Sequence, residues 1–245
     1  MRRKTIVVVA LLIAACAVSA WADEIVFGFR PVPPYVMIDA AGKFSGLEYE
    51  IIVAALAVKG HTVKPQQMPL ARLVATFNEG GIKGAAPVLA TTATTGTLSV
   101  SYITYNNVAM GLKAAGLKIE KIADLKGLGI VAFQTATKAL GPDFAAAVEG
   151  NPKYVEEAAQ ITQIRMLVGK RVDVVIGESR ILNYYLKAPE TGVDSGTPVV
   201  EFRIFNPTNY SVAFANPKHA EDFNAGLAEI KKNGTYDAIM KKYAK

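Results

Sequence analysis

Segments with the pattern of buried strands alternate with segments of helical spacing along almost the whole chain. This alternation constrains the fold most, because strands separated by helices pair in parallel while the helices cover the sheet. It predicts an α/β fold with mostly parallel sheets. Strands are expected at residues 24–29, 62–66, 84–89, 108–112, 130–133, 154–156, 172–176 and 209–215, and helices at 47–58, 71–78, 138–148, 162–168, 179–186, 218–232 and 236–243.

The predicted elements fall into two units, in each of which strands and helices alternate. Each unit ends in an apolar strand followed by polar residues, and ligands of open α/β sheets bind beyond the carboxyl ends of strands. We therefore expect two α/β lobes joined by two hinge crossings, with a cleft between them that closes around a ligand. Lobe 1 should comprise residues 23–109 and 211–245, and lobe 2 residues 110–210.

The first 22 residues have the pattern of a secretory signal. Three basic residues precede the apolar run 6–15, which is too short to span a membrane, and Ala20-Trp21-Ala22 fits a small-x-small cleavage site. A cleaved signal peptide, residues 1–22, predicts a periplasmic protein that begins at Asp23. The alternative is a lipid anchor at Cys16, which ends a lipoprotein-like box but is followed by apolar residues instead of a polar tether.

Composition excludes several kinds of chemistry. Cys16 is the only cysteine, so the mature chain would have neither disulfides nor a catalytic thiol. The only histidines, His61 and His219, lie far apart in sequence and show no metal-ligand spacing. Of the 27 basic residues three lie in the signal, which leaves 24 against 21 acidic residues and no basic patch with interleaved aromatics. We expect no cofactor, no metal, no nucleic-acid partner and a monomer.

Several short motifs occur along the chain in a fixed order. They are Pro33-Pro34-Tyr35, the turn at residues 42–51 (GKFSGLEYEI), Asp124-Leu125-Lys126-Gly127, the strand 172–176 (VDVVI) and the terminal segment 226–236 (GLAEIKKNGTY). Each motif is weak evidence alone, but together, in this order and behind a signal segment, they are strong evidence. The set resembles family 3 of the periplasmic solute-binding proteins, the receptors of amino-acid-type ABC importers.

This resemblance implies a type II periplasmic binding protein-like fold and a non-enzymatic receptor. Such a receptor delivers a small polar solute to the membrane permease of an ABC importer. Amino-acid receptors of the family usually hold the ligand α-carboxylate with an arginine after the third strand, but residues 90–95 here contain no basic residue. Two alternatives stay open: a dehydratase-like enzyme on the same scaffold and a free periplasmic sensor.

Two polar loops are candidate ligand contacts. Gln134, Thr135 and Thr137 follow a buried strand and open a helix, where backbone N–H groups and hydroxyls suit a small anion. Thr91 and Thr92 follow the third strand of the first unit in the same way. Plain helix capping is the alternative for the first loop, and an ordinary surface loop is the alternative for the second.

Three further residues offer charge or an aromatic face. Glu178 follows a strand at the expected cleft and could hold a ligand ammonium; the alternative is a helix-start acid. Arg72, at the start of a helix, could hold an anion, with a surface arginine as the alternative. Tyr35 could stack on the ligand or simply pack on its prolines. Glu48 and Glu50 do not share a helix face, so they are not interpreted as an acid/base pair.

Overall fold

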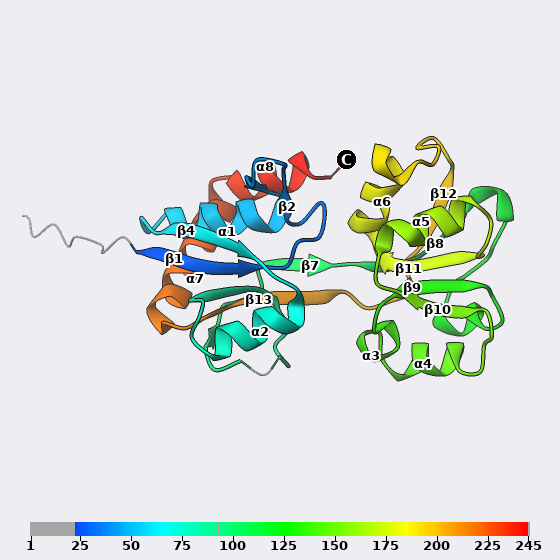
Figure 1. Ribbon diagram of the computed structural model, residues 1–245, viewed down its shortest axis with the longest axis horizontal. Helices are drawn as coiled ribbons and strands as arrows, with labels where there is room; N and C mark the ends of the chain where they lie inside the picture. The colour runs from blue at the N-terminus through cyan, green and yellow to red at the C-terminus, as the bar shows by residue number, and fades with distance from the viewer. Residues whose placement is uncertain (1–22, 93, 245) are drawn as a thin grey trace, which may run out of the picture.

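The computed structural model describes residues 23–92 and 94–244. The expected signal segment with Cys16 lies outside the described residues. Figure 1 shows two α/β bodies side by side, joined in the middle by extended chain. The predicted α/β class is therefore confirmed, and each body is built on its own sheet.

The first unit is built on a sheet with the strand order β4-β1-β5-β13-β6. β1 pairs in parallel with β4 and β5, while β13 runs antiparallel to β5 and also pairs with β7. A small two-stranded sheet, β2 with β3, accompanies it. The strands are β1 (Glu24–Phe29), β2 (Met37–Ile38), β3 (Phe44–Ser45), β4 (Thr62–Gln67), β5 (Gly84–Val88), β6 (Thr97–Leu98), β7 (Ile103–Tyr105) and β13 (Thr208–Phe214).

The second unit is built on a sheet with the order β10-β9-β11-β8-β12. β9 is parallel to both β10 and β11, and β8 is antiparallel to β11 and β12. The carboxyl ends of β9 and β11 therefore point the same way. The strands are β8 (Asn107–Leu112), β9 (Ile130–Phe133), β10 (Tyr154–Glu157), β11 (Val174–Glu178) and β12 (Val199–Phe202).

The chain passes between the two sheets twice. The first passage, from β7 to β8, has only Asn106 between the two strands. The second runs from β12 to β13 through residues 203–207. Figure 1 shows both passages in the gap between the two bodies, so the units are tied together by two nearby segments.

Helices cover both sheets, and their ends follow local sequence signals. The Asn216 side chain accepts a hydrogen bond from the Lys218 N–H at 3.0 Å, and Pro217 occupies the first position of α7. Gly234, with a φ of 82°, separates α7 from α8. The helices are α1 (Leu47–Ala57), α2 (Leu70–Asn78), α3 (Ala136–Ala139), α4 (Pro142–Val148), α5 (Gln160–Val168), α6 (Ser179–Lys187), α7 (Pro217–Lys232) and α8 (Thr235–Lys242), with 3₁₀ turns η1 (Lys113–Ala115), η2 (Ile122–Leu125) and η3 (Pro189–Thr191).

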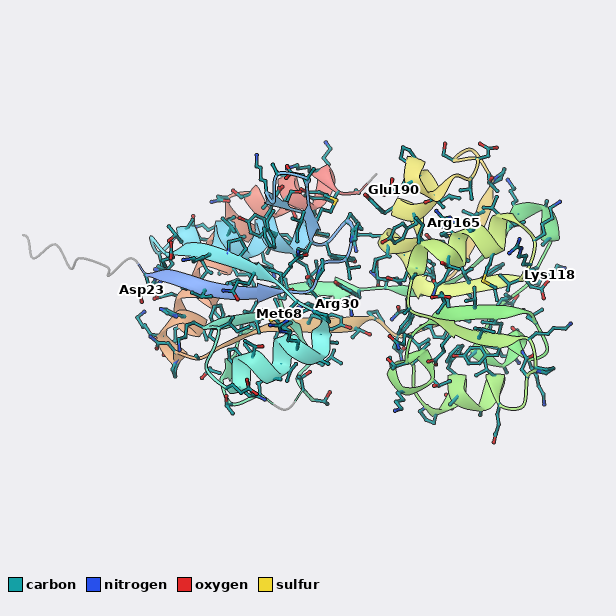
Figure 2. All side chains as sticks on the ribbon, in the orientation of Figure 1. Asp23, Arg30, Met68, Lys118, Arg165 and Glu190 are labelled. Carbon is teal, nitrogen blue, oxygen red and sulfur yellow. The ribbon has the colours of Figure 1, made fainter. Side chains whose placement is uncertain are left out.

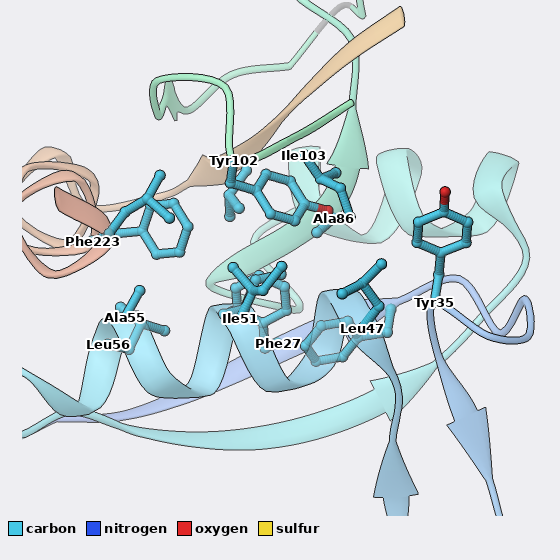
Figure 3. Packing of buried hydrophobic residues seen from close by; sticks show 14 of the residues in the cluster. Phe27, Tyr35, Leu47, Ile51, Ala55, Leu56, Ala86, Tyr102, Ile103 and Phe223 are labelled. Atoms are coloured by element: carbon cyan, nitrogen blue, oxygen red, sulfur yellow. The ribbon is translucent and has the colours of Figure 1, made fainter. Parts of the chain in front are cut away.

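The largest core lies in the first unit, between its sheet and α1 and α7. Figure 3 shows Phe27, Ile51 and Phe223 at its centre, and all three are fully buried. α1 and α7 approach so closely that a Cβ on Gly226 would lie 1.9 Å from the Ala55 carbonyl oxygen. In the described chain no helix combines the length and apolar character that crossing a membrane requires.

Some elements differ from the sequence prediction. The single bent helix predicted at 138–148 is wrong: it is two helices, because Gly141 adopts a φ of 88° and Pro142 starts α4 afresh. The short strands β6, β7 and β12 were not predicted. Two to four residues carry too little periodicity to identify a strand.

Candidate functional site

A polar cavity of about 380 Å³ lies where the two units meet. Its wall is formed by α6 and the end of β12 from the second unit, by the crossing residue Asn106 and by the C-terminal residues Tyr243 and Ala244. In Figure 1 these segments lie on the upper side of the junction, with the C-terminus opposite α6. The remaining lining residues are Glu178, Ser179, Arg180, Asn183, Lys187, Glu201 and Arg203.

Glu178 lies at the centre of this junction, at the carboxyl end of β11. Its side chain is 3% exposed and caps α6: Oε2 accepts from the N–H groups of Arg180 (2.7 Å) and Ile181 (3.1 Å). Oε1 accepts the Asn106 N–H at 3.3 Å. Burial raises the pKa of Glu178, although these hydrogen bonds favour its charged form. The helix-capping alternative therefore describes one of its roles, and its second role is to hold the crossing at Asn106.

Arg180 connects Glu178 to Tyr35 of the first unit. Its Nη1 lies 3.7 Å from Glu178 Oε1 and donates to Tyr35 Oη over 3.4 Å. Tyr35 is fully buried and stacks on Tyr105, with ring centroids 4.2 Å apart at 24°. The structure thus brings two of the predicted residues, Tyr35 and Glu178, into one cluster with an arginine that the sequence interpretation did not select.

A second buried carboxyl group lies behind this cluster. Glu48 on α1 is completely buried, and its Oε1 accepts the Tyr105 hydroxyl at 2.8 Å. Its Oε2 has no hydrogen-bond partner of good geometry within the described chain. Burial raises the pKa of Glu48 to about 7, with the Tyr105 hydrogen bond opposing the rise. The positive charge of Arg30, which directly follows β1, also acts to lower this pKa.

The expected anion site at the start of α3 is filled by the chain's own carboxylate. Glu156 on β10 accepts from the N–H groups of Thr135 (2.6 Å) and Thr137 (3.0 Å) and from the Thr137 hydroxyl (3.0 Å). Burial raises the Glu156 pKa, but hydrogen bonds from Thr137, Tyr154 and Thr135 outweigh it and hold the pKa below its ordinary value. These amides are therefore not free, and Gln134 beside them is exposed.

The remaining candidates lie on the first unit. Arg72 is exposed on α2. Thr91 is exposed, whereas the hydroxyl of Thr92 accepts the Leu89 N–H at 3.1 Å and closes a turn after β5. In Figure 1, α2 and α3 lie on the lower side of the junction, the side opposite the cavity. Among the described residues, the hydrogen bonds of the α3 start lead to Glu156, and the Thr92 hydroxyl bonds within its own turn.

The comparisons with known proteins were consistent with this architecture. The family model of the bacterial extracellular solute-binding proteins, family 3, matches residues 25–245. The chain belongs to this family. No curated relative matches the sequence of this family 3 protein significantly.

Solved structures share the fold of this family 3 protein. An ancestral cationic amino acid solute-binding protein superposes with a TM-score of 0.72 at 21% identity, over 91% of this chain and 96% of that one. A substrate-binding protein of an ABC uptake transporter from Streptococcus pneumoniae, with bound histidine, superposes with a TM-score of 0.69 at 20% identity, over 90% of this chain and 92% of that one. A histidine kinase sensor domain superposes with a TM-score of 0.69 at 17% identity, over 90% of this chain and 95% of that one. The type II periplasmic binding protein-like fold is therefore confirmed.

Arg180, Asn106, Glu48 and Glu156 are site features that sequence reasoning missed. The sequence did hold a signal for Arg180, which follows the selected Glu178 by two residues and lies at the start of a helix at the expected cleft. It held no signal for Glu48 and Glu156, because the hydrogen-bond partners that give them a role, Tyr105 and Thr137, lie more than 15 residues away in the sequence.

Proposed function

We propose that this family 3 protein is a periplasmic receptor that captures a small polar solute between its two units. It then delivers the solute to the permease of an ABC importer. The observation that supports this most is the polar junction, where Arg180 of one unit lies 3.7 Å from Glu178 of the same unit and donates to Tyr35 of the other unit over 3.4 Å. In a protein of a solute-binding family, movement of the two units would break or form the contact between Arg180 and Tyr35, so binding of a solute at the junction could be coupled to that movement.

The two units are proposed to act as lobes. Taken from the two passages between the sheets, lobe 1 would comprise residues 23–105 and 208–244 and lobe 2 residues 107–202, within a few residues of the boundaries expected at 109/110 and 210/211. Asn106 is the natural pivot, because it alone separates β7 from β8 and because Glu178 and Ser179 hold its N–H and C=O groups. Closure would carry Arg72, Thr91 and Thr92 toward the start of α3.

The ligand is proposed to be of the amino-acid type. Two neighbouring structures are described as amino-acid-binding, one cationic and one with bound histidine. Each carboxylate oxygen accepts about two hydrogen bonds, so Glu178 Oε2 is fully used, and a ligand ammonium would bind Oε1 beside the Asn106 N–H and in competition with Arg180 Nη1, 3.7 Å away. Tyr35 beside it would contact the ligand body.

The anionic end of the ligand needs a different partner. At the α3 start it would have to displace the Glu156 carboxylate from Thr135 and Thr137, whereas Gln134 remains exposed. Arg72 on α2 is exposed and carries a full charge, so we propose it as the anion partner. A charge-assisted hydrogen bond contributes on the order of 1.5–3 kcal/mol, which corresponds to roughly tenfold or more in affinity.

Thermal denaturation of the purified protein with amino acids, polyamines, dicarboxylates and small peptides would identify the ligand. A compound at about 100 times its Kd should add about 2.7 kcal/mol of stability. Calorimetry would then compare Arg72→Gln and Glu178→Gln with Lys64→Gln, a control in which an exposed lysine on β4 is changed. The first two should bind at least about tenfold more weakly, and the control should bind normally. Near-native affinity in both variants would refute the assignment.

Binding without conversion separates the receptor from a dehydratase-like enzyme. Incubating the protein with its stabilising ligand should return that ligand unchanged by mass spectrometry. Product formed over many turnovers would support the enzyme instead.

A further inference from the structure

The two histidines of the chain meet at the end of the first unit that faces away from the junction. His61 directly precedes β4, His219 lies in the first turn of α7, and Asp23 directly precedes β1. β1 and β4 are parallel, with Glu24 opposite Thr62, so Asp23 and His61 are necessarily neighbours. Figure 2 shows Asp23 at the start of β1 and Arg30 at its other end, nearer the junction of the two units.

One ligand atom from each of Asp23, His61 and His219 lies within 4.8 Å of the other two. The Asp23 carboxylate is 2.8 Å from His219 Nε2, and the Asp23 N–H is 3.2 Å from His61 Nδ1. The imidazole rings are 5.1 Å apart and nearly perpendicular, at 70°. Two imidazole nitrogens and a carboxylate oxygen form a donor set that suits Zn²⁺ and its first-row neighbours.

Asp222 supports His61 from the outer side. Its Oδ2 lies 3.2 Å from His61 Nε2, and Lys218 binds its other oxygen. A carboxylate at this position accepts a proton from Nε2, which leaves the lone pair of Nδ1 on the side of Asp23, where it now accepts the Asp23 N–H. Metal-binding histidines are commonly oriented in this way by a carboxylate.

Burial differs among the three groups in a way that suits a bound ion. The side chains of His61 and His219 are 4% and 10% exposed, whereas that of Asp23 is 51% exposed. The nitrogens are therefore held rigidly in the protein, and the carboxylate side is open to an entering ion. His219 Nδ1 is buried and has no hydrogen-bond partner in the described chain, so the present hydrogen bonds do not fully account for this cluster.

We propose that Asp23, His61 and His219 form a binding site for one divalent transition-metal ion, with Zn²⁺ the best match. Zn–N and Zn–O bonds of about 2.0–2.2 Å place tetrahedral ligands about 3.3–3.6 Å apart. Ligand atoms as far as 4.8 Å apart must therefore approach by roughly 1 Å, whereas the Asp23 carboxylate and His219 Nε2, now 2.8 Å apart, must separate. Water would complete the coordination. Cleavage after Ala22 would turn the Asp23 nitrogen into a terminal amine, a further donor on which the site does not depend. The ion would fasten the first strand to α7.

Zinc binding is measurable cleanly because the chain has no other histidines. The purified protein, with any tag free of histidine and placed at the C-terminus, would be titrated with ZnCl₂ by calorimetry. Co²⁺ absorption would be recorded in parallel as a signature of nitrogen coordination. One ion per chain should bind at micromolar or lower concentration, raise the melting temperature, and be removed by a chelator.

Variants decide whether the ion occupies this site. His61→Gln and His219→Gln should each weaken Zn²⁺ binding at least tenfold, while Asp143→Asn, a change of an exposed acid on α4, should leave it unchanged. Should either histidine variant fail to fold by circular dichroism, Asp23→Asn, with its exposed side chain, gives the same test. Absence of saturable Zn²⁺ binding to the unaltered protein, or full binding by folded variants, would overturn the proposal.

Discussion

Replacing Glu48 with glutamine should remove a loss of stability that the protein suffers as the pH rises. Glu48 is fully buried, one of its oxygens has no hydrogen-bond partner of good geometry among the described residues, and its pKa is raised to about 7 from an ordinary value of 4.5. A carboxyl whose pKa is raised by folding holds its proton more tightly in the folded state. Stability therefore falls as the pH rises from the unfolded pKa to the folded pKa, and is lowest above about 7.

The size of this loss follows from the pKa difference. A shift of about 2.5 units corresponds to about 3 kcal/mol, of which about 2–3 kcal/mol should develop between about pH 5 and pH 8. Glutamine has nearly the same shape, still accepts the Tyr105 hydroxyl and never ionises. Other titrating groups, such as Glu178, are present in both proteins, so their contributions largely cancel when the stability of Glu48→Gln is compared with that of the unaltered protein.

The measurement is urea denaturation, followed by circular dichroism, of both proteins at several pH values across that range. The free energy of unfolding of the unaltered protein should fall by about 2–3 kcal/mol relative to Glu48→Gln as the pH rises. A difference between the two proteins that stays constant with pH would show that Glu48 does not titrate as its burial requires.

Three other changes give definite expectations. Glu156→Ala should destabilise the protein by about 1 kcal/mol, since it removes the acceptor for the Thr135 and Thr137 amides. Because folding lowers the Glu156 pKa, the stabilisation is complete above the unfolded pKa and disappears as the pH falls through the folded pKa, so the effect of the substitution should shrink in acid. Denaturation at about pH 4 and pH 7 tests both expectations. Gly226→Ala should cost about 1–3 kcal/mol or more, because its Cβ would meet the Ala55 carbonyl, and an unchanged melting temperature would contradict the close packing of α1 and α7. Arg180→Gln should lower the affinity for an identified ligand through lost positioning of Glu178 and Tyr35, with Lys64→Gln, the change of an exposed lysine on β4 outside the cavity, as the calorimetric control.

The fold was accessible from the sequence because its signals are local and repeated. β5 is apolar throughout and β11 is apolar up to its last residue, Glu178, while the caps at Asn216 and Gly234 mark helix ends without reference to tertiary structure. The gaps in the prediction are the elements that depend on partners. β7 exists as a strand because β13 lies beside it, and three residues carry no pattern of their own.

The candidate site was harder to predict from the sequence, because it too depends on partners that only the fold brings together. Residue type and position at a strand end selected Glu178, which does lie at the junction. They could not show that Glu156 fills the α3 start, because β10 is only adjacent to it through pairing with β9. Nor could they show that two histidines far apart in the sequence meet at one end of a sheet.

The central claim, capture of a solute by closure of two lobes, is tested most directly by the distance between them. Fluorescent labels would be attached to cysteines introduced at Glu79 and Asp143, exposed positions near α2 and α4 on the same side of the junction. Cys16 is the only native cysteine and lies in the expected signal, so secreted protein would be labelled at these two sites alone. Energy transfer should rise in a saturable, one-site manner as the stabilising ligand is added. Binding of that ligand with no change in energy transfer would contradict the account.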